Sequence, residues 1–308
     1  MRLGTGPRLL SRPGLRTYDA RLPFETRHVS VSLVYVRDLL AEATRMDIRF
    51  YRMAAPVVPV VNAVDLDPFR RQLDGCLALA EMVGAEAQSM GMRLTVHPTL
   101  DIQLGSGEEA IVRRSAALAS AWEALFAAMG LGSEARVVVH RGGSGPQADA
   151  AFVANALALP PAVRGRLAIE NDERQCSLDA ALWLSRQTGI PVVWDYLHWR
   201  CAGRRGRSPG DCYAAAAATW PQGVPAKVHF SSPRTAAEHG RPPQARAHAD
   251  YLDPFAFLDF AGGIGDACDV MLEAGAKDLA LLKLRQDLAA IGADALGHPG
   301  GTSLAAAG

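Results

Sequence analysis

The sequence predicts a single α/β domain, a (β/α)₈ TIM barrel, and three observations lead to that fold. Short β-branched runs alternate along the chain with longer stretches rich in alanine and leucine, which is the pattern of parallel βα units. Eight such runs occur, the number of strands that closes this barrel. The chain has 308 residues, 49% of them hydrophobic, and this is long enough because such barrels need about 250 residues.

The predicted elements alternate in order through the chain. We expect strands at residues 1–4, 48–53, 93–97, 135–140, 166–170, 191–195, 226–230 and 268–273. We expect helices at residues 31–45, 69–90, 108–129, 147–156, 178–188, 212–219, 255–260 and 276–291. Residues 1–295 therefore form one predicted domain, and the Gly/Ala-rich residues 296–308 form a predicted flexible tail.

Composition limits the classes of protein to consider. No apolar run approaches the roughly 18 residues that a membrane span needs, and the start lacks the apolar core of a secretory signal. The five cysteines form no CxxC pair, which suits a reducing compartment better than a disulfide framework. We therefore expect a soluble cytoplasmic protein with no membrane partner, and we take a monomer as the default.

The charge distribution is more informative than the net charge, which is zero and so does not predict nucleic-acid binding. Two connecting loops are locally basic. Residues 196–211 contain Arg200, Arg204, Arg205 and Arg207 against one acid, and residues 231–249 contain Arg234, Arg241 and Arg246 against Glu238. These loops are candidates for gripping phosphate, although surface loops are often charged without such a partner.

Six of the eight predicted strands end in a residue that can bind a metal ion. These residues are His97, His140, Glu170, Asp195, His229 and Glu273. The carboxyl ends of the strands in a parallel barrel meet at one rim, where active sites of this fold are built, so the six side chains should converge. A single strand-end histidine or aspartate often only caps a loop, but six in register indicate a site.

Three of these residues are carboxylates, and burying them together requires a cation. Carboxylates within about 4 to 6 Å of one another repel, so Glu170, Asp195 and Glu273 would otherwise be forced to take up protons. Histidine mixed with carboxylate suits Mn²⁺, Zn²⁺ or Fe²⁺ better than Mg²⁺ or Ca²⁺. We expect two or three divalent ions, a number that suits in-line displacement at phosphorus.

Three further residues extend the candidate ligand set. His198 lies just beyond the sixth strand, His248 lies at the end of the loop after the seventh, and Lys227 precedes His229 by two positions. Period-two alternation points Lys227 and His229 to the same inward side. A lysine inside a cation-rich barrel either titrates to a neutral amine, is modified to an acid, or faces substrate phosphate. We assign catalytic roles to Glu170, Lys227 and His229.

Several longer motifs are specific enough to indicate a family. They are Arg2-Leu3-Gly4, Asp47-Ile48-Arg49-Phe50-Tyr51-Arg52, His97-Pro98, Val139-His140-Arg141-Gly142-Gly143, Glu170-Asn171-Asp172, Lys227-Val228-His229-Phe230-Ser231, His248-Ala249-Asp250-Tyr251 and Asp269-Val270-Met271-Leu272-Glu273. Over nearly its whole length, and in the same order, the chain resembles the UV damage endonuclease family, which is related to the endonuclease IV and xylose isomerase barrels. The resemblance implies a xylose isomerase-like barrel.

The resemblance also implies a function. It implies a metal-dependent DNA repair endonuclease that cuts the phosphodiester 5′ to a UV-type or other helix-distorting lesion in double-stranded DNA, by metal-hydroxide attack that leaves a 3′-hydroxyl. It implies Mn²⁺ before other metals, and it matches Lys227 to the family's lysine that is carboxylated at its tip. The residues that we expect to contact DNA are Arg141, Arg200, Arg204, Arg205, Arg234 and Leu100.

The chain departs from the family at residues that face the DNA. After His-Pro the family has Gly-Gln-Tyr, which probes the damaged duplex, whereas this chain has Thr99-Leu100-Asp101. The other departures are Thr5 for a tyrosine, Ala54-Ala55 for a Ser-Ser pair, and Asn62-Ala63 where a histidine is expected, with Asp65 or Asp67 as a conceivable substitute. We therefore expect retained metal chemistry and altered lesion recognition, with Leu100 as an apolar substitute for the probing pair.

Two other functions stay open from the sequence. A sugar isomerase or epimerase on the same barrel would use Glu170 and Glu273 to hold a metal that polarises a carbonyl, but a small polyol needs no arginine-bearing loops. A diverged DNA-binding relative with weak or no activity would explain the lost probing residues, but it would leave the buried carboxylates without a use.

Overall fold

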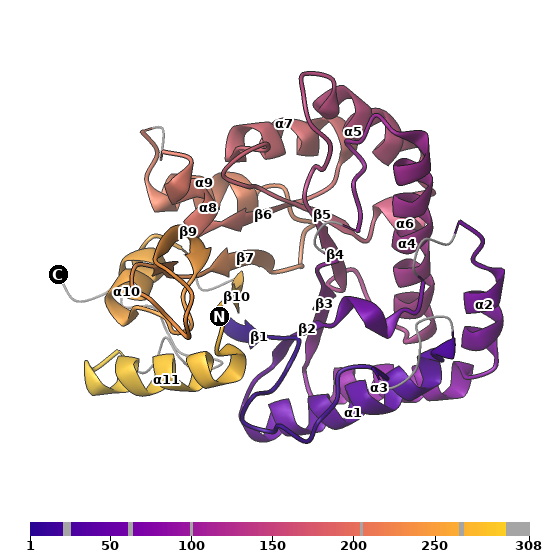
Figure 1. Ribbon diagram of the computed structural model, residues 1–308, viewed down its shortest axis with the longest axis horizontal. Coiled ribbons are helices and arrows are strands. Elements are labelled where there is room, and N and C mark those ends of the chain that lie inside the picture. Colours follow the sequence, from indigo (N-terminus) through magenta and orange to yellow (C-terminus); the bar gives the residue numbers. More distant parts are fainter. Residues whose placement is uncertain (21–25, 61–63, 99–100, 204–205, 265–267, 294–308) are drawn as a thin grey trace.

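The computed structural model describes residues 1–20, 26–60, 64–98, 101–203, 206–264 and 268–293, and it contains a closed barrel of eight strands (Figure 1). The strands are β1 (Arg2–Thr5), β2 (Phe50–Met53), β3 (Arg93–Val96), β4 (Arg136–Val139), β5 (Leu167–Glu170), β6 (Val192–Asp195), β7 (Ala226–Phe230) and β10 (Cys268–Leu272). All neighbouring pairs are parallel, in the order β1-β10-β7-β6-β5-β4-β3-β2. The predicted (β/α)₈ barrel is confirmed, and each strand lies within two residues of its expected range.

Helices surround the barrel and mostly follow the predicted ranges (Figure 1). They are α1 (Val29–Arg45), α2 (Asp67–Asp74), α3 (Leu77–Ser89), α4 (Glu109–Ala128), α5 (Ala148–Ala158), α6 (Pro161–Arg164), α7 (Leu178–Thr188), α8 (Tyr196–Cys201), α9 (Pro209–Ala217), α10 (Pro254–Gly262) and α11 (Lys277–Ala290), with a short 3₁₀ turn η2 (Ala55–Val57). Across the described ranges, every helix is too short or too polar to cross a membrane.

One predicted helix is wrong, because residues 69–90 form two helices. Gly75 ends α2, and Cys76 has a φ of −132° that interrupts the helical path before α3 begins. Glycine is the poorest helix former after proline, so it weakens a continuous helix at this point. The predicted tail at residues 296–308 lies outside the described residues.

A hairpin that the sequence did not predict follows β7. It consists of the antiparallel strands β8 (Pro233–Arg234) and β9 (Gln244–His248). A bridge between Glu238 and Arg241 encloses a turn in which His239 and Gly240 have φ values of 47° and 76°, as two-residue hairpin turns require. The hairpin leads the chain out and back, so that His248 returns to the barrel rim opposite Pro233.

The amino end of the barrel is closed by a buried charged cluster. Arg93 is fully buried, and its Nη1 lies 2.7 Å from Asp269 Oδ2. The Nη2 atom of Arg2 lies 2.7 Å from the same oxygen. The Arg93 guanidinium also lies over the rings of Phe50 and Trp220. This end of the barrel is therefore packed shut, and the open rim is the carboxyl end.

A cluster of aromatic rings anchors the helices that follow β6 and β7. Tyr196 stacks on Phe230 with ring centroids 5.5 Å apart, and Phe230 lies 4.9 Å from Phe260. Trp194 contacts both Trp199 and Phe260, at 5.7 and 5.8 Å. Such aromatic pairs contribute beyond the area that they bury. They fix α8 and α10 against the barrel and so hold the carboxyl-end loops of β6 and β7.

Close packing at Gly84 gives a first test of the fold. A Cβ atom at this position of α3 would lie 1.7 Å from the Met129 carbonyl oxygen. Gly84→Ala should therefore lower the free energy of unfolding by about 1 to 3 kcal/mol, the usual cost of overpacking, although alanine is the better helix former. Chemical denaturation measures the change. Gly132→Ala is the control, because a Cβ there meets nothing within 4 Å; equal losses in both variants would contradict this packing.

Candidate metal centre

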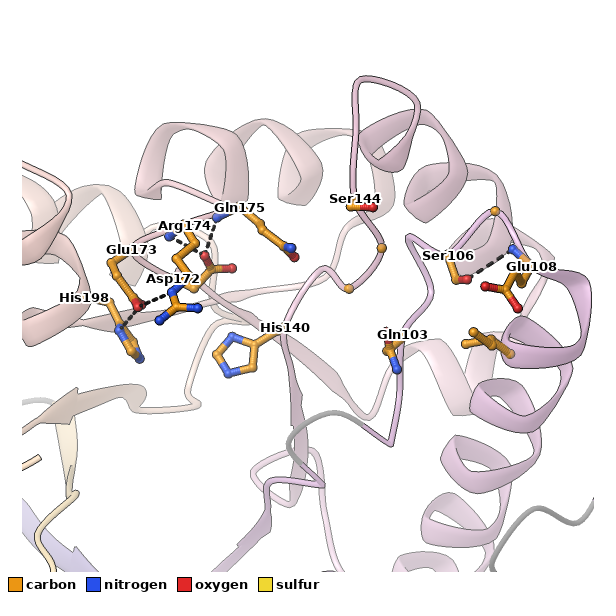
Figure 2. Close-up of a pocket in the computed structure, with 14 residues that line it drawn as sticks. Gln103, Ser106, Glu108, His140, Ser144, Asp172, Glu173, Arg174, Gln175 and His198 are labelled. Carbon is orange, nitrogen blue, oxygen red and sulfur yellow. Dashed lines mark hydrogen bonds and ion pairs between the residues drawn. The ribbon is translucent and has the colours of Figure 1, made fainter. Parts of the chain in front are cut away.

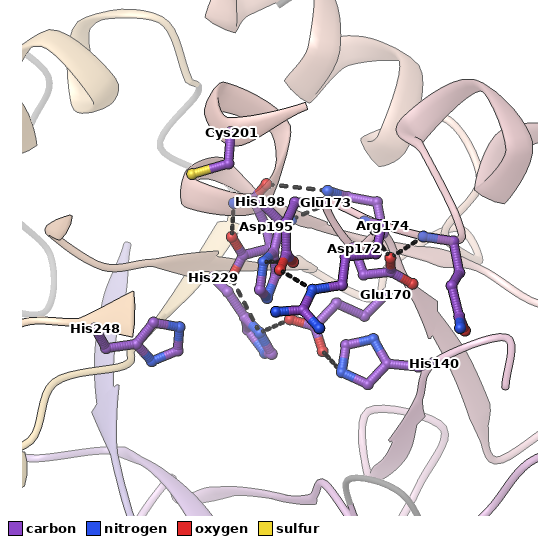
Figure 3. Close-up of polar contacts among 12 residues, drawn as sticks. His140, Glu170, Asp172, Glu173, Arg174, Asp195, His198, Cys201, His229 and His248 are labelled. Atoms are coloured by element: carbon purple, nitrogen blue, oxygen red, sulfur yellow. Dashed lines mark hydrogen bonds and ion pairs between the residues drawn. The ribbon is translucent and has the colours of Figure 1, made fainter. Parts of the chain in front are cut away.

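The six strand-end residues lie together at the carboxyl-end rim of the barrel, and Figure 3 shows His140, Glu170, Asp195 and His229 among them. Glu170 and Asp195 are the last residues of β5 and β6, and Glu273 directly follows β10. The potential ligands form two groups, each with ligand atoms within 4.8 Å of one another: His97, His140 and Glu170, and Glu170, Asp195, His229 and Glu273. Strand order alone explains this convergence, and the role of the residues as ligands stays a prediction.

Glu170 belongs to both groups, because its two oxygens face different histidines. Its Oε2 atom lies 2.8 Å from His97 Nε2 and 3.7 Å from His140 Nε2. Its Oε1 atom lies 2.6 Å from His229 Nδ1. The carboxylate is fully buried, so its charge is shielded by these neighbours and not by water. A residue in this position could contribute an oxygen to each of the two ligand groups.

The tautomer of His97 explains why a cation fits between it and Glu170. His97 Nδ1 lies 3.0 Å from the Val138 carbonyl oxygen, and a carbonyl only accepts hydrogen bonds, so Nδ1 must carry a proton. In the neutral ring, Nε2 then presents a lone pair to the Glu170 carboxylate. Two electron-rich atoms 2.8 Å apart need a proton or a metal ion between them. Donation from a ligand histidine to a backbone carbonyl in this way is common in metal sites.

Unpartnered buried atoms support the same conclusion. His229 Nε2, His140 Nδ1 and Asp195 Oδ2 are buried and have no hydrogen-bond partner among the described residues. His229 Nδ1 also lies 3.6 Å from Glu273 Oε1 and 3.9 Å from Asp195 Oδ2. Burying unpaired polar atoms costs free energy, and metal ions relieve such costs. The donor set of imidazole nitrogens and carboxylate oxygens therefore fits a cluster of divalent ions.

The protonation of the site reflects the crowding of like charges. Burial raises the pKa of Asp195 to about 8, and repulsion from Glu170 and Glu273 adds to this against the attraction of His198. Burial also raises the pKa of Glu170, but the nearby histidines, His229 first, take it well below its usual range. Burial lowers the pKa of the His229 ring to about 4. Protons thus distribute unequally over carboxylates that a cation would hold ionised together.

His198 and His248 lie beside the strand-end residues, with side chains that are partly exposed (Figure 3). The ring centroids of His198 and His248 are 6.1 Å apart, and those of His140 and His198 are 6.2 Å apart. His248 Nδ1 lies 3.7 Å from Glu273 Oε2. His198 is turned instead toward Glu173, whose Oε2 lies 2.8 Å from its Nδ1. The sequence did not single out Glu173, since it follows the strand end by three residues.

Lys227 points inward beneath the metal centre, as the alternation with His229 predicts. Its side chain is fully buried, and Nζ donates to Thr95 Oγ1 over 3.2 Å. Burial, with Arg52 and Arg93 nearby, takes its pKa well below the usual value. The neutral amine is therefore the form that this site favours, and its proposed carboxylation and ligand role stay predictions.

Arg52 is a site residue to which the sequence analysis gave no role. It lies in β2 and forms an ion pair with Glu273, in which both side chains are largely buried. This guanidinium contacts Oε1 of the carboxylate and neutralises part of its charge, whereas His248 faces Oε2. Its position in a buried strand could have indicated a role, because an arginine is rarely buried without an acidic partner.

The residues expected to contact DNA differ in their exposure. Arg141 and Arg234 are buried; Arg141 Nη1 lies 2.6 Å from Asp149 Oδ1, and Arg234 donates to the Pro242 carbonyl and the Gln244 side chain. These bonds give both arginines a structural role in their loops. Arg200 is half-buried, with its guanidinium 5.5 Å from the Tyr196 ring centroid. Leu100, Arg204 and Arg205 lie outside the described residues.

The departures from the family pattern have ordinary structural roles where they are described. Thr5 and Ala54 are buried at the ends of β1 and β2. Asp65 Oδ1 accepts a hydrogen bond from Asp67 N, and Asp67 lies 3.5 Å from Arg70 Nη1. Both aspartates therefore serve the start of α2. Residues 61–63, where the histidine was expected, lie outside the described residues.

A cavity of about 700 Å³ opens beside the centre, over the loops that follow β3, β4 and β5 (Figure 2). His140 and His198 line the wall nearest the metal ligands, and Gln103, Ser144 and Gln175 line it farther out. This volume lies in the range of small-molecule sites. Amide and hydroxyl groups beside a metal centre can orient a polar, ring-sized group.

A closed parallel barrel with a buried histidine and carboxylate cluster at its carboxyl end defines a class, the TIM barrels whose carboxyl-end rim is able to bind metal. Within that class, a family model described as UV-endonuclease UvdE matches residues 27–298 of this chain. The chain belongs to the UV-endonuclease UvdE family. The expected family is thereby confirmed.

Relatives and solved structures agree with this assignment. A protein of Halalkalibacterium halodurans named UV DNA damage endonuclease is 32% identical over 262 residues, which cover 82% of this chain and 78% of that protein. The crystal structure of SacUVDE matches with a TM-score of 0.79 and 25% identity, covering 95% of this chain and 99% of that one. Endonuclease IV from Thermus thermophilus, at 20% identity and a TM-score of 0.54 over 83% and 94% of the two chains, shares the fold.

Glu170→Gln tests whether one carboxylate serves both ligand groups. The substitution keeps the size of the side chain and removes its charge, so the bound divalent metal should fall by at least one ion per chain while the fold is retained. Elemental analysis after dialysis measures the metal, and circular dichroism reports the fold. Glu109→Gln, at a glutamate whose side chain is 83% exposed in α4, is the matched control. Full metal content in Glu170→Gln would remove Glu170 from the ligand set.

The raised pKa of Asp195 predicts that the free energy of unfolding of the metal-free protein depends on pH. Its pKa is about 8 in the folded chain and about 3.9 when unfolded. A raised folded-state pKa stabilises the protein at low pH, and this contribution is lost as pH rises through 8, at up to about 1.4 kcal/mol per pH unit. In EDTA, the free energy of unfolding should therefore fall from roughly pH 4 to pH 8 and level off above pH 8, and that of Asp195→Asn should fall less.

Urea denaturation across that pH range measures the effect. Asp74→Asn, at an exposed residue that ends α2, should follow the wild-type curve. Parallel curves for Asp195→Asn and the wild type would contradict the raised pKa.

Proposed function

We propose that this protein is a metal-dependent DNA repair endonuclease that incises the strand 5′ to UV-type or other helix-distorting lesions and leaves a 3′-hydroxyl. Its membership of the UV-endonuclease UvdE family supports endonuclease activity on damaged DNA. The observation that carries the metal dependence is Glu170, whose two oxygens face both ligand groups. We further propose that the protein acts as a monomer in the cytoplasm on damaged double-stranded DNA.

The metal is expected to be Mn²⁺, in two or three ions, with Zn²⁺ or Fe²⁺ as alternatives. The residues that would hold it are His97, His140, Glu170, Asp195, His198, Lys227, His229, His248 and Glu273, with Lys227 carboxylated at Nζ. When bound, divalent ions supply Lewis acidity for displacement at phosphorus.

The chain's own residues prepare the site for that chemistry. Glu170 holds the two groups at a fixed separation because both of its oxygens are engaged. His97 keeps its proton on Nδ1 for Val138, which leaves Nε2 free. Arg52 balances the charge of Glu273, so that a negatively charged phosphodiester meets less repulsion at the rim.

The cavity beside His140 and His198 supports action on a distorted duplex. It is large enough, at about 700 Å³, for an extrahelical nucleotide. Unstacking a damaged pair costs less than unstacking a sound one, which gives a route to selectivity. With the probing pair of the family replaced at residues 99–101, Gln103 and Gln175 at the cavity wall are the groups that we expect to contact the base.

A sugar epimerase is the weaker alternative. D-psicose 3-epimerase from Clostridium cellulolyticum H10 shares the fold at 13% identity. Polarising one carbonyl needs one ion, whereas Glu170 is positioned for two groups of ligands. A non-catalytic DNA-binding relative would not need either group.

Nicking of supercoiled plasmid tests the proposed function. Purified protein with Mn²⁺ should convert UV-irradiated plasmid to the open circular form and leave untreated plasmid intact, and EDTA should stop the reaction because the carboxylates then lack their cations. Glu170→Gln should reduce the rate by at least about 100-fold, the scale of losing a main electrostatic contribution to catalysis. Equal nicking of irradiated and untreated plasmid, or nicking that survives EDTA, would contradict the proposal.

A further inference from the structure

Four of the eight residues that line a second hollow at the rim have cationic side chains. The hollow has a volume of about 390 Å³ and lies between the β8–β9 hairpin and the start of α11. This hollow, here called the cationic pocket, has the side chains of Arg234, Arg241, Arg246 and Lys277 in its wall, together with His248, whose pKa is lowered by burial. The remaining lining comes from Ala247, Ala274 and Gly275. Side chains that only donate hydrogen bonds, as these arginines and the lysine do, specify an anion.

Two of these cations form no ion pair within the described residues. Arg241 Nη2 lies 2.5 Å from Asp250 Oδ1, and Arg234 is bonded to Pro242 and Gln244. By contrast, Arg246 and Lys277 form no ion pair or side-chain hydrogen bond with any residue that the structure describes. The nearby acid Asp250 is already engaged by Arg241 and His239. The cationic pocket therefore carries an excess of positive charge.

The backbone at the edge of the pocket is held in place and adds to this charge. Helix α11 begins at Lys277, and its N-cap residue Ala276 supplies no side-chain acceptor. The amino end of a helix of this length carries a partial positive charge. Lys277 itself has a φ of 52°, a conformation that costs a non-glycine residue free energy and that clusters at functional sites. Gly275 is packed so closely that a Cβ would lie 1.9 Å from Asp250 Oδ1.

The cationic pocket adjoins the metal centre. His248 lines the pocket, and its Nδ1 lies 3.7 Å from Glu273 Oε2 in the centre. Ala274, which also lines the pocket, directly follows Glu273. An anion in the pocket would therefore sit next to whatever group the metal centre acts on, on the side of β10.

We propose that the cationic pocket binds a phosphodiester of the incised DNA strand that neighbours the one that is cut, with Lys277 and Arg246 as its charged contacts. This inference rests on the proposed function and names a positioning contact within it. A repeating polyanion satisfies both sites at once, because it presents one phosphate to the metal centre and the next to the cationic pocket. The contact fixes which bond lies over the metal ions without reading sequence.

Charge removal at the pocket is the test. Lys277→Gln and Arg246→Gln are compared with Lys283→Gln, a matched control on α11 whose side chain is 53% exposed and pairs with Asp287. The ligand is a lesion-bearing duplex already nicked at the proposed incision position, which metal-loaded protein can bind and has no bond left to cut. Fluorescence anisotropy should give a Kd about tenfold weaker for each pocket variant, as for one charge-assisted hydrogen bond. The slope of log Kd against log salt should flatten by about one.

A neutral linkage identifies the phosphate. Duplexes carry a single methylphosphonate at successive positions around the nick, and one position should weaken binding by the wild type and Lys283→Gln but leave Lys277→Gln unchanged. Unaltered Kd in both pocket variants, or equal sensitivity of Lys277→Gln and the wild type at every position, would overturn the proposal. Because the readout is binding, a wild type that binds with this pattern and fails to nick irradiated plasmid would count against the proposed function alone.

Discussion

The burial of three carboxylates at one rim is the constraint on which the rest of this structure depends. Glu170, Asp195 and Glu273 end strands of a closed barrel, and the barrel leaves them little water to share. Burial and mutual repulsion give these carboxylates different pKa values. The pKa of Asp195 is the one that is raised, so Asp195 holds the proton in the metal-free protein. A cation cluster removes this conflict, since it offers each oxygen a positive partner. The histidines around Glu170 contribute to the same site, because His97 uses Nδ1 for the Val138 carbonyl and turns Nε2 toward the carboxylate.

The scaffold keeps this arrangement rigid from three sides. The ion pair of Arg93 with Asp269 closes the amino end of the barrel. The strands therefore cannot spread apart at that end to separate the like charges at the rim. Aromatic rings hold α8, and with it His198, against β6 and β7. The β8–β9 hairpin carries His248 back to the rim. Side chains fixed in this way lose little further freedom when ions or substrate bind, which favours binding.

The two hollows beside the metal centre have differently charged linings, so the two sides of the rim suit different parts of a nucleotide. The larger cavity adjoins His140 and His198 and is lined by amide, hydroxyl and acidic groups together with Arg174, and its acids outnumber its cation, which suits a base more than a phosphate. The cationic pocket adjoins His248 and suits a phosphate. A strand crossing the centre would thus place its backbone toward α11 and its displaced base toward the loops after β3 to β5.

The sequence by itself determined the barrel and the convergence of its ligands, because strand number and the parallel direction of strands dictate that strand-end residues such as His97 and Glu273 meet at one rim. It also determined that Lys227 points inward, since alternation along a strand is local. Only the tertiary structure decided that Glu170 faces both ligand groups, that Arg52 pairs with Glu273, and that Arg141 is buried against Asp149. These pairings depend on distances between residues far apart in the chain. Local patterns assign each residue to a strand or loop, whereas packing decides which charges are close enough to neutralise one another.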